Sequence, residues 1–116
     1  MAINRIEPGS RMSKAVVHAG TVYLAGQVAD DPKADISTQT QQVLDKIDGY
    51  LRQAGTGKSN LLSATIYITD MRNFQAMNAV WDAWVDKENT PARATVEARL
   101  ANSELLVEIM AIAALP

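Results

Sequence analysis

An amphipathic stretch at residues 36–54 constrains the fold more than any other part of the sequence. Its apolar and weakly polar side chains recur at helical spacing and form one stripe, which comprises Ile36, Thr40, Val43, Leu44, Ile47, Tyr50, Leu51 and Ala54. Asp35 is a suitable N-cap before this stretch, and Gly55 is a suitable stop after it. A helix with one apolar stripe has to bury that stripe against a second layer, so the sequence predicts a layered domain.

Apolar segments, several of them alternating, flank this helix on both sides and predict β-strands. The expected strands lie at 3–6, 15–18, 21–26, 61–69, 94–98 and 105–114. In the fourth strand, one face is expected to carry Leu62, Ala64, Ile66 and Ile68, and the other Ser63, Thr65, Tyr67 and Thr69.

A second amphipathic helix is expected to begin at Asp70 or Asn73. Its inner stripe is expected to comprise Phe74, Met77, Asn78, Trp81, Trp84 and Val85. Because both helices connect strands, they are expected on one face of a mixed sheet, in a single α+β domain over residues 1–116. The other sheet face would be uncovered, and association with further copies of the chain should seal it.

Length and charge exclude several classes of protein. The 116 residues suffice for one hydrophobic core, and the net charge of −2 provides no general basic surface for nucleic acid. The chain has no cysteine, which excludes disulfides, a thiol nucleophile and a zinc–thiolate site. The first residues lack an apolar signal core, and no apolar run approaches the ~20 residues of a membrane span. These features predict a cytoplasmic protein.

Two charged residues stand in strand-like apolar segments near the C-terminus. Arg93 opens one segment, and Glu108 lies within the other. The polar stretch 99–104 predicts a turn between them, and an antiparallel hairpin would bring Arg93 level with Glu108. A charge buried in a sheet is costly unless it is paired. Two interpretations follow: an ion pair that only holds the sheet together, or a site that binds a carboxylate.

The segment 55–59 reads Gly-Thr-Gly-Lys-Ser and resembles the end of a phosphate-binding P-loop. That motif requires a glycine five positions before Gly57, where this chain has Arg52. It also requires a strand before the loop and a helix after it, which is the reverse of the expected order. The segment is therefore interpreted as a turn from helix to strand.

Several segments together resemble the RidA (YjgF) family of reactive enamine and imine deaminases. These segments are 22–27 (VYLAGQ), 39–40 (QT), 65–70 (TIYITD), 74–78 (FQAMN) with Trp81 and Trp84, 91–93 (PAR) and 107–109 (VEI). Two further stretches, 10–11 (SR) and 81–85 (WDAWV), are similar to the divergent YoaB-like branch. The resemblance covers nearly the whole chain. It implies a chorismate-mutase-like α+β fold and a homotrimer with ligand clefts between subunits.

The resemblance also implies roles for individual residues. Arg93 would hold a substrate carboxylate and Glu108 would position the attacking water, while Thr95, Gly26 and Met12 would line the substrate site. The chemistry fits these roles, because arginine binds a carboxylate through two parallel hydrogen bonds and a partly buried glutamate can accept a proton from water. Neither a metal nor an organic cofactor is required.

The chain differs from typical deaminases of the family at three places near this site. It has Met12 in a segment that usually carries a tyrosine, Ala25 where a serine is usual, and Thr95 where a cysteine is frequent. The first two differences remove polar contacts from the cleft and so bear on substrate preference. Thr95 retains a hydroxyl that can donate a hydrogen bond.

These features bear on three functions. The first is hydrolysis of small reactive 2-imino or enamine acids to 2-oxo acids and ammonia. The second is non-catalytic binding of small carboxylates at the same clefts. The third is RNA cleavage, which the acidic balance and the single His18 argue against, because it favours a basic surface and paired acid–base groups. The expected partners are a small carboxylate or imino acid and other copies of the chain, without nucleic acid or a membrane.

Overall fold

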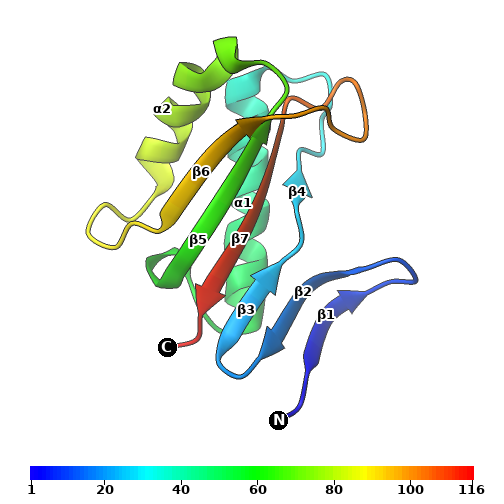
Figure 1. The fold of residues 1–116 in the computed structure, drawn as a ribbon, viewed down its shortest axis with the longest axis vertical. Coiled ribbons are helices and arrows are strands. Elements are labelled where there is room, and N and C mark those ends of the chain that lie inside the picture. Colours follow the sequence, from blue (N-terminus) through cyan, green and yellow to red (C-terminus); the bar gives the residue numbers. More distant parts are fainter.

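A mixed β-sheet with both helices on one face makes up the computed structural model, which describes residues 1–116 (Figure 1). The strands are β1 (Asn4–Pro8), β2 (Ser13–His18), β3 (Thr21–Leu24), β4 (Gln27–Val28), β5 (Leu61–Ile68), β6 (Ala92–Glu97) and β7 (Val107–Ala114). The helices are α1 (Ile36–Ala54) and α2 (Phe74–Trp84), and the short 3₁₀ turns are η1 (Lys58–Asn60) and η2 (Met71–Asn73). The predicted α+β class is confirmed.

The sheet runs in the order β1-β2-β3-β7-β5-β6, with β4 also paired to β7. The β5–β6 pair is parallel, because α2 carries the chain back to the starting end of the sheet, and the other pairs are antiparallel. The predicted hairpin of the last two strands is therefore wrong. β6 and β7 do run in opposite directions, but β5 lies between them.

α1 is the element that the sequence predicted best. The Asp35 side chain accepts a hydrogen bond of 2.8 Å from the Thr38 N–H, and this bond lowers the pKa of the Asp35 carboxyl below its usual value. Gly55 ends the helix in the left-handed conformation, with a φ of 94°. Leu44 and Leu51 on the inner stripe have no exposed surface, so α1 supplies much of the core beneath the sheet.

β5 contains an irregularity that reverses one expected orientation. The register of β5 against β7 shifts between Leu61 and Ser63, which is a β-bulge. As a result, Leu61 is buried and Leu62 is 50% exposed, so the prediction that Leu62 faces the helices is wrong. The alternation beyond the bulge is as expected, with Ala64 and Ile66 buried.

α2 covers the other half of the same sheet face. It follows η2, where the Asp70 side chain accepts a hydrogen bond from the Arg72 N–H, and it buries Met77, Trp81 and Trp84.

The segment 55–59 leads from α1 into η1 and β5, which is the reverse of the order in a P-loop.

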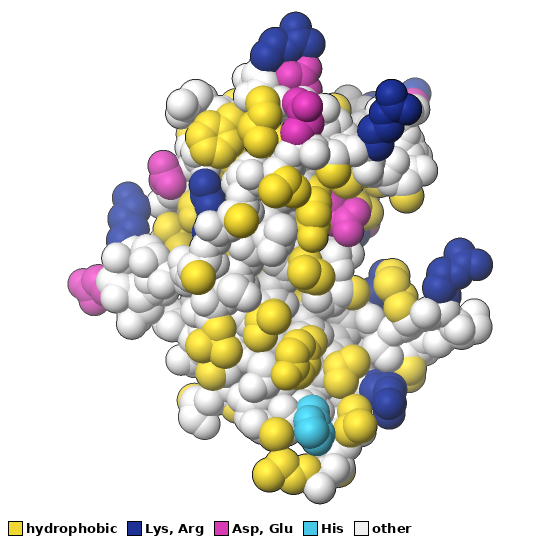
Figure 2. All heavy atoms as spheres, in the orientation of Figure 1, with side chains coloured by type: hydrophobic (Ala, Val, Ile, Leu, Met, Phe, Trp, Pro, Cys, Tyr) yellow, Lys and Arg dark blue, Asp and Glu magenta, His cyan; other side chains and the backbone are white.

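The opposite sheet face is uncovered and largely apolar. It presents exposed side chains of Tyr23, Leu62, Val96 and Met110. Figure 2 shows this face, with hydrophobic side chains across its middle and most of the charged side chains around its rim. Neither helix combines the length and the hydropathy needed to cross a membrane.

Candidate functional site

Arg93 lies on β6, the edge strand, and its side chain is on the face covered by the helices. Its register partner is Ala64 of β5, which is buried beneath α2. The Arg93 guanidinium carbon is 5.2 Å from the centroid of the Trp81 ring, within range for a cation–π contact. Trp81 is only 5% exposed, so it provides a fixed platform for a half-buried cation.

Two polar atoms on this side of the sheet are buried without a hydrogen-bond partner. They are Oγ1 of Thr95, two residues beyond Arg93 on β6, and Oδ1 of Asn78 on α2. An unpartnered buried polar atom is unfavourable by about 1–3 kcal/mol, which marks a place where a ligand or water can be accommodated. The helical periodicity predicted Asn78 only as a member of the inner stripe of the second helix. A polar side chain within an otherwise apolar helix stripe was the feature of the sequence that could have indicated a role for Asn78.

A shallow cavity of about 260 Å³ opens where β6 begins. Arg93, Ala92 and Ala94 line it from β6, and 63–65 of β5 line it from the neighbouring strand. Because strand side chains alternate between faces, Ala92, Ala94, Ser63 and Thr65 point to the open face, so this cavity lies mainly on the sheet face opposite the Arg93 side chain. On the helix-covered face, the Arg93 guanidinium is half-buried, lies against Trp81 and makes no ion pair, which suits the binding of a small anion.

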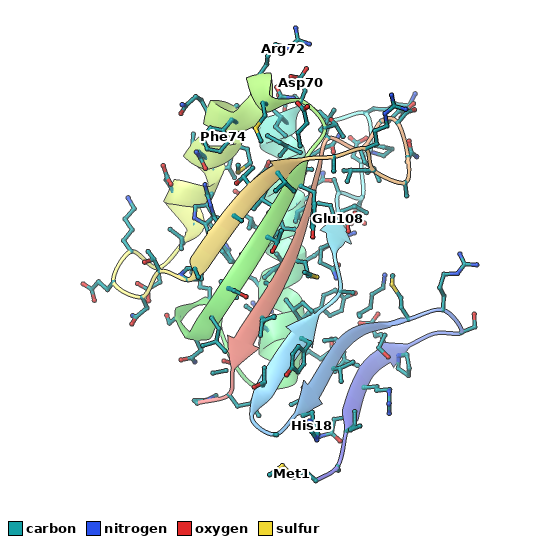
Figure 3. All side chains as sticks on the ribbon, in the orientation of Figure 1. Met1, His18, Asp70, Arg72, Phe74 and Glu108 are labelled. Atoms are coloured by element: carbon teal, nitrogen blue, oxygen red, sulfur yellow. The ribbon has the colours of Figure 1, made fainter.

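Glu108 lies on β7, on the open face of the sheet (Figure 3). Its register partners are Tyr67 of β5 and Val28 of β4. The backbone of Gly26 passes directly beside it, and a Cβ added to Gly26 would lie 2.9 Å from the Glu108 carboxyl carbon. A side chain at position 26 would therefore displace the Glu108 carboxylate from its present position. The absence of a side chain at Gly26 thus leaves room for the Glu108 carboxylate.

A second shallow cavity, of about 320 Å³, adjoins Glu108. It is lined by Tyr67, Glu108, Met110 and residues 98–101. The Glu108 carboxylate therefore has solvent-accessible space on one side and the Gly26 backbone on the other.

Gln39 anchors the segment that leads into β7 and hence helps to place Glu108. This buried side chain accepts a hydrogen bond from the Leu106 N–H at 2.9 Å and donates one to the Glu104 carbonyl at 3.1 Å. It also donates to the Pro32 carbonyl before α1. One fully satisfied amide thus ties the loop before α1 to the start of β7.

Arg93 and Glu108 do not meet within one chain. Their register partners on β5, Ala64 and Tyr67, are three residues apart, so the two charged side chains point to opposite sheet faces. The two ion pairs of the chain are Lys46–Asp30 and Arg72–Asp70. The interpretation of an Arg93–Glu108 pair inside one sheet is therefore wrong.

The predicted site residues fall into three separate groups. Arg93 and Thr95 share the helix-covered side of β6, Glu108 and Gly26 lie together on the open side near β4, and Met12 is 52% exposed between β1 and β2. β1 and β6 are opposite ends of the sheet order, so Met12 is far from Arg93 along the sheet. In this structure no group of three or more His, Cys, Asp or Glu side chains is placed to hold a metal ion.

This architecture defines a class of small α+β domains, here with a charged side chain on each face of the sheet, Arg93 on one and Glu108 on the other. The chain matches the family model described as "Endoribonuclease L-PSP" over residues 2–115. It is 46% identical to a RutC family protein of Haemophilus ducreyi, with 97% of each chain covered. It is 43% identical to the RutC family protein YoaB of Escherichia coli, with 98% of this chain and 99% of YoaB covered.

A solved structure of a YjgF family member has the same fold. NMB1025 of Neisseria meningitidis, a member of the YjgF protein family, superimposes with a TM-score of 0.97 at 42% identity, covering 100% of this chain and 97% of that one. The chain therefore belongs to the YjgF (RidA) family and is a YoaB-like member of it.

Proposed function

We propose that this protein hydrolyses small reactive 2-imino acids, and their enamine tautomers, to 2-oxo acids and ammonia. The oxygen of one water bonds to the imine carbon, the C–N bond breaks, and the nitrogen leaves as ammonia with the protons that the water supplied. The observation that carries the proposal is Arg93, a half-buried cation held on a ring without an ion-pair partner, on the same strand face as the unpartnered Thr95 hydroxyl. A 2-imino acid has a carboxylate next to its electrophilic carbon, and a guanidinium binds a carboxylate with two parallel hydrogen bonds.

Glu108 is proposed as the group that orients the water and accepts its proton. Its carboxylate adjoins a cavity, makes no ion pair, and lies beside the Gly26 backbone. These features support a role as a general base, which has to be within hydrogen-bond reach of the water that it activates. The unpartnered hydroxyl of Thr95 is proposed to bond to the substrate near Arg93.

The active unit is proposed to be a homotrimer with the chorismate-mutase-like arrangement that the family resemblance implies. Since Arg93 and Glu108 point to opposite faces of one sheet, a site that uses both has to combine two subunits. The exposed apolar side chains of Tyr23, Leu62 and Met110 support association through the open face. The number three, and the reach of Met12 into a neighbouring cleft, rest on the resemblance alone.

A coupled assay tests this proposal. An amino-acid oxidase generates the imine of alanine in the presence of semicarbazide, which traps whatever imine remains, and the protein should lower the yield of the trapped product. Glu108→Gln should remove this effect but keep the affinity for pyruvate, because an amide cannot accept the proton of water. Wild-type protein that leaves the trapped yield unchanged would overturn the proposal.

Non-catalytic carboxylate binding is the alternative that uses the same Arg93 geometry. It predicts calorimetric binding of pyruvate by the wild type without any loss of trapped imine. The description of the family model also names a ribonuclease. The net charge of −2 and the apolar open face give no support to RNA binding by this chain.

A further inference from the structure

A third pocket lies next to the Glu108 cavity and has no part in the function proposed above. It has a volume of about 320 Å³ and is lined by Thr69, Arg99, Leu100, Asn102 and Ser103. Arg99 and Leu100 also line the cavity beside Glu108, so the two spaces share a wall.

The walls of this pocket are rich in hydrogen-bond donors and contain no acidic residue. The Asn102 Oδ1 accepts a hydrogen bond of 2.9 Å from the Glu104 N–H, which leaves the amide NH₂ available. Arg99 belongs to neither ion pair of the chain and offers its guanidinium. With the hydroxyls of Thr69 and Ser103, the pocket presents donors of the kind that bind carboxylates.

Backbone hydrogen bonds fix the loop that forms the pocket. The Ala98 N–H donates to the Ile68 carbonyl at 2.9 Å, and the Thr69 N–H donates to the Leu106 carbonyl at 3.1 Å. The Leu105 N–H closes the loop by donating to the Asn102 carbonyl at 3.1 Å. Both ends of the loop are thus attached to the end of β5, and Arg99 in this loop lines both cavities.

We propose that this pocket binds the distal acid group of the substrate, so that the preferred substrates are 2-imino dicarboxylic acids of the kind formed from aspartate or glutamate. The inference rests on the proposed function, because it places the imine carbon at Glu108 and the 2-carboxylate on Arg93 of another subunit. A substrate with one carboxylate would leave the donors around Arg99 unused. The hydrolysis itself is the same addition of water and loss of ammonia.

Calorimetry with 2-oxo acids tests the pocket without relying on catalysis. The probes are oxaloacetate and 2-oxoglutarate, with two carboxylates, and pyruvate, with one. Wild-type protein should bind at least one diacid about tenfold or more tightly than pyruvate, the gain typical of one charge-assisted hydrogen bond. Arg99→Gln should reduce this diacid-to-pyruvate affinity ratio about tenfold. Ser103→Ala, which keeps the cation, should reduce the ratio less.

Arg52→Gln is the matched control, because Arg52 is an exposed arginine at the end of α1. It should leave the affinity ratio unchanged, which excludes a general effect of net charge. In the trapping assay, the wild-type protein should show the same preference as a kcat/KM that is about tenfold or more higher for the imine of aspartate than for the imine of alanine. Arg99→Lys should restore part of the preference, because it restores the charge without the planar fork.

The outcomes separate this inference from the proposed function. Wild-type protein that binds both diacids no more tightly than pyruvate, or Arg99→Gln with an unchanged ratio, would overturn the inference while alanine imine hydrolysis still stood. Failure to hydrolyse either imine would overturn the proposed function, and the calorimetric ratio would still decide whether the pocket binds the second carboxylate.

Discussion

Arg93 and Glu108 lie on opposite faces of the same sheet, separated by the intervening strand β5. Arg93 faces α2 and contacts Trp81, whereas Glu108 faces the uncovered side and contacts the Gly26 backbone. One copy of the chain thus contains both proposed site residues, but the two side chains cannot act on the same substrate molecule within that copy. Association of copies is therefore part of the catalytic proposal and does more than cover an apolar surface.

Substitution of Arg93 separates ligand binding from stability. Arg93→Ala should abolish calorimetric binding of pyruvate, and Arg93→Lys should weaken it about tenfold, because lysine keeps the charge but loses the fork. Both variants should unfold within about 1 kcal/mol of the wild type, since Arg93 belongs to neither ion pair of the chain. A loss of about 3–5 kcal/mol in Arg93→Ala would instead identify a buried structural charge.

Gly26→Ala should impair catalysis through steric overlap with Glu108. The added Cβ would lie 2.9 Å from the carboxyl carbon and 3.1 Å from Cγ of Glu108, so the side chain has to move away. We expect at least a tenfold drop in kcat with a smaller change in KM.

Gly49→Ala is the control for that substitution. Gly49 lies within α1, and an added Cβ there would meet no atom within 4 Å. It should raise the free energy of unfolding by roughly 0.5–1 kcal/mol and leave kcat unchanged. Normal kcat in Gly26→Ala would show that the position of Glu108 does not matter for the reaction.

Trp81→Phe tests whether the ring under Arg93 positions the guanidinium. Phenylalanine gives a weaker cation–π contact than tryptophan, so pyruvate affinity should fall about threefold to tenfold, or roughly 1 kcal/mol. Trp84→Phe is the comparison, because Trp84 contacts Lys58 rather than Arg93 and donates a hydrogen bond of 2.9 Å to Asp48. That variant should lose stability and keep its affinity. Equal affinity losses in the two variants would refute a specific role for Trp81.

Leu51→Ala tests the packing of α1. Leu51 has no exposed surface and belongs to the main core, so its truncation should lower the free energy of unfolding by about 2–5 kcal/mol. Gln53→Ala, at an exposed position on the same helix, should change it by less than about 0.5 kcal/mol. Chemical denaturation measured at fixed protein concentration checks both values, and similar small losses in the two variants would contradict the observed burial.

Features that depend on local spacing were the ones predictable from the sequence. The stripe of α1, its Asp35 cap and its Gly55 stop all lie within one helix, where periodicity of 3.6 residues and capping chemistry are decisive. The two strands predicted at 15–18 and 21–26 also depend on local alternation, and the structure has β2 and β3 there, paired as a hairpin.

Features that depend on distant pairing were not predictable in the same way. Sequence proximity favoured a hairpin of the last two strands, but β5 occupies the position between them. That error placed Arg93 directly opposite Glu108. As a result, the sequence did not indicate that the two side chains point to different faces of the sheet. The outward turn of Leu62 has a similar origin, since a bulge is set by the register with β7.

Mixing two inactive variants tests the central claim most directly. Arg93→Ala and Glu108→Gln proteins are each purified, then unfolded and refolded together in equal amounts, and imine hydrolysis is measured by the trapping assay. If each site takes Arg93 from one subunit and Glu108 from another, random assortment into trimers should restore about a quarter of the wild-type sites. The account predicts activity near that level in the mixture and none in either variant refolded alone. A mixture no more active than its two parents would contradict it.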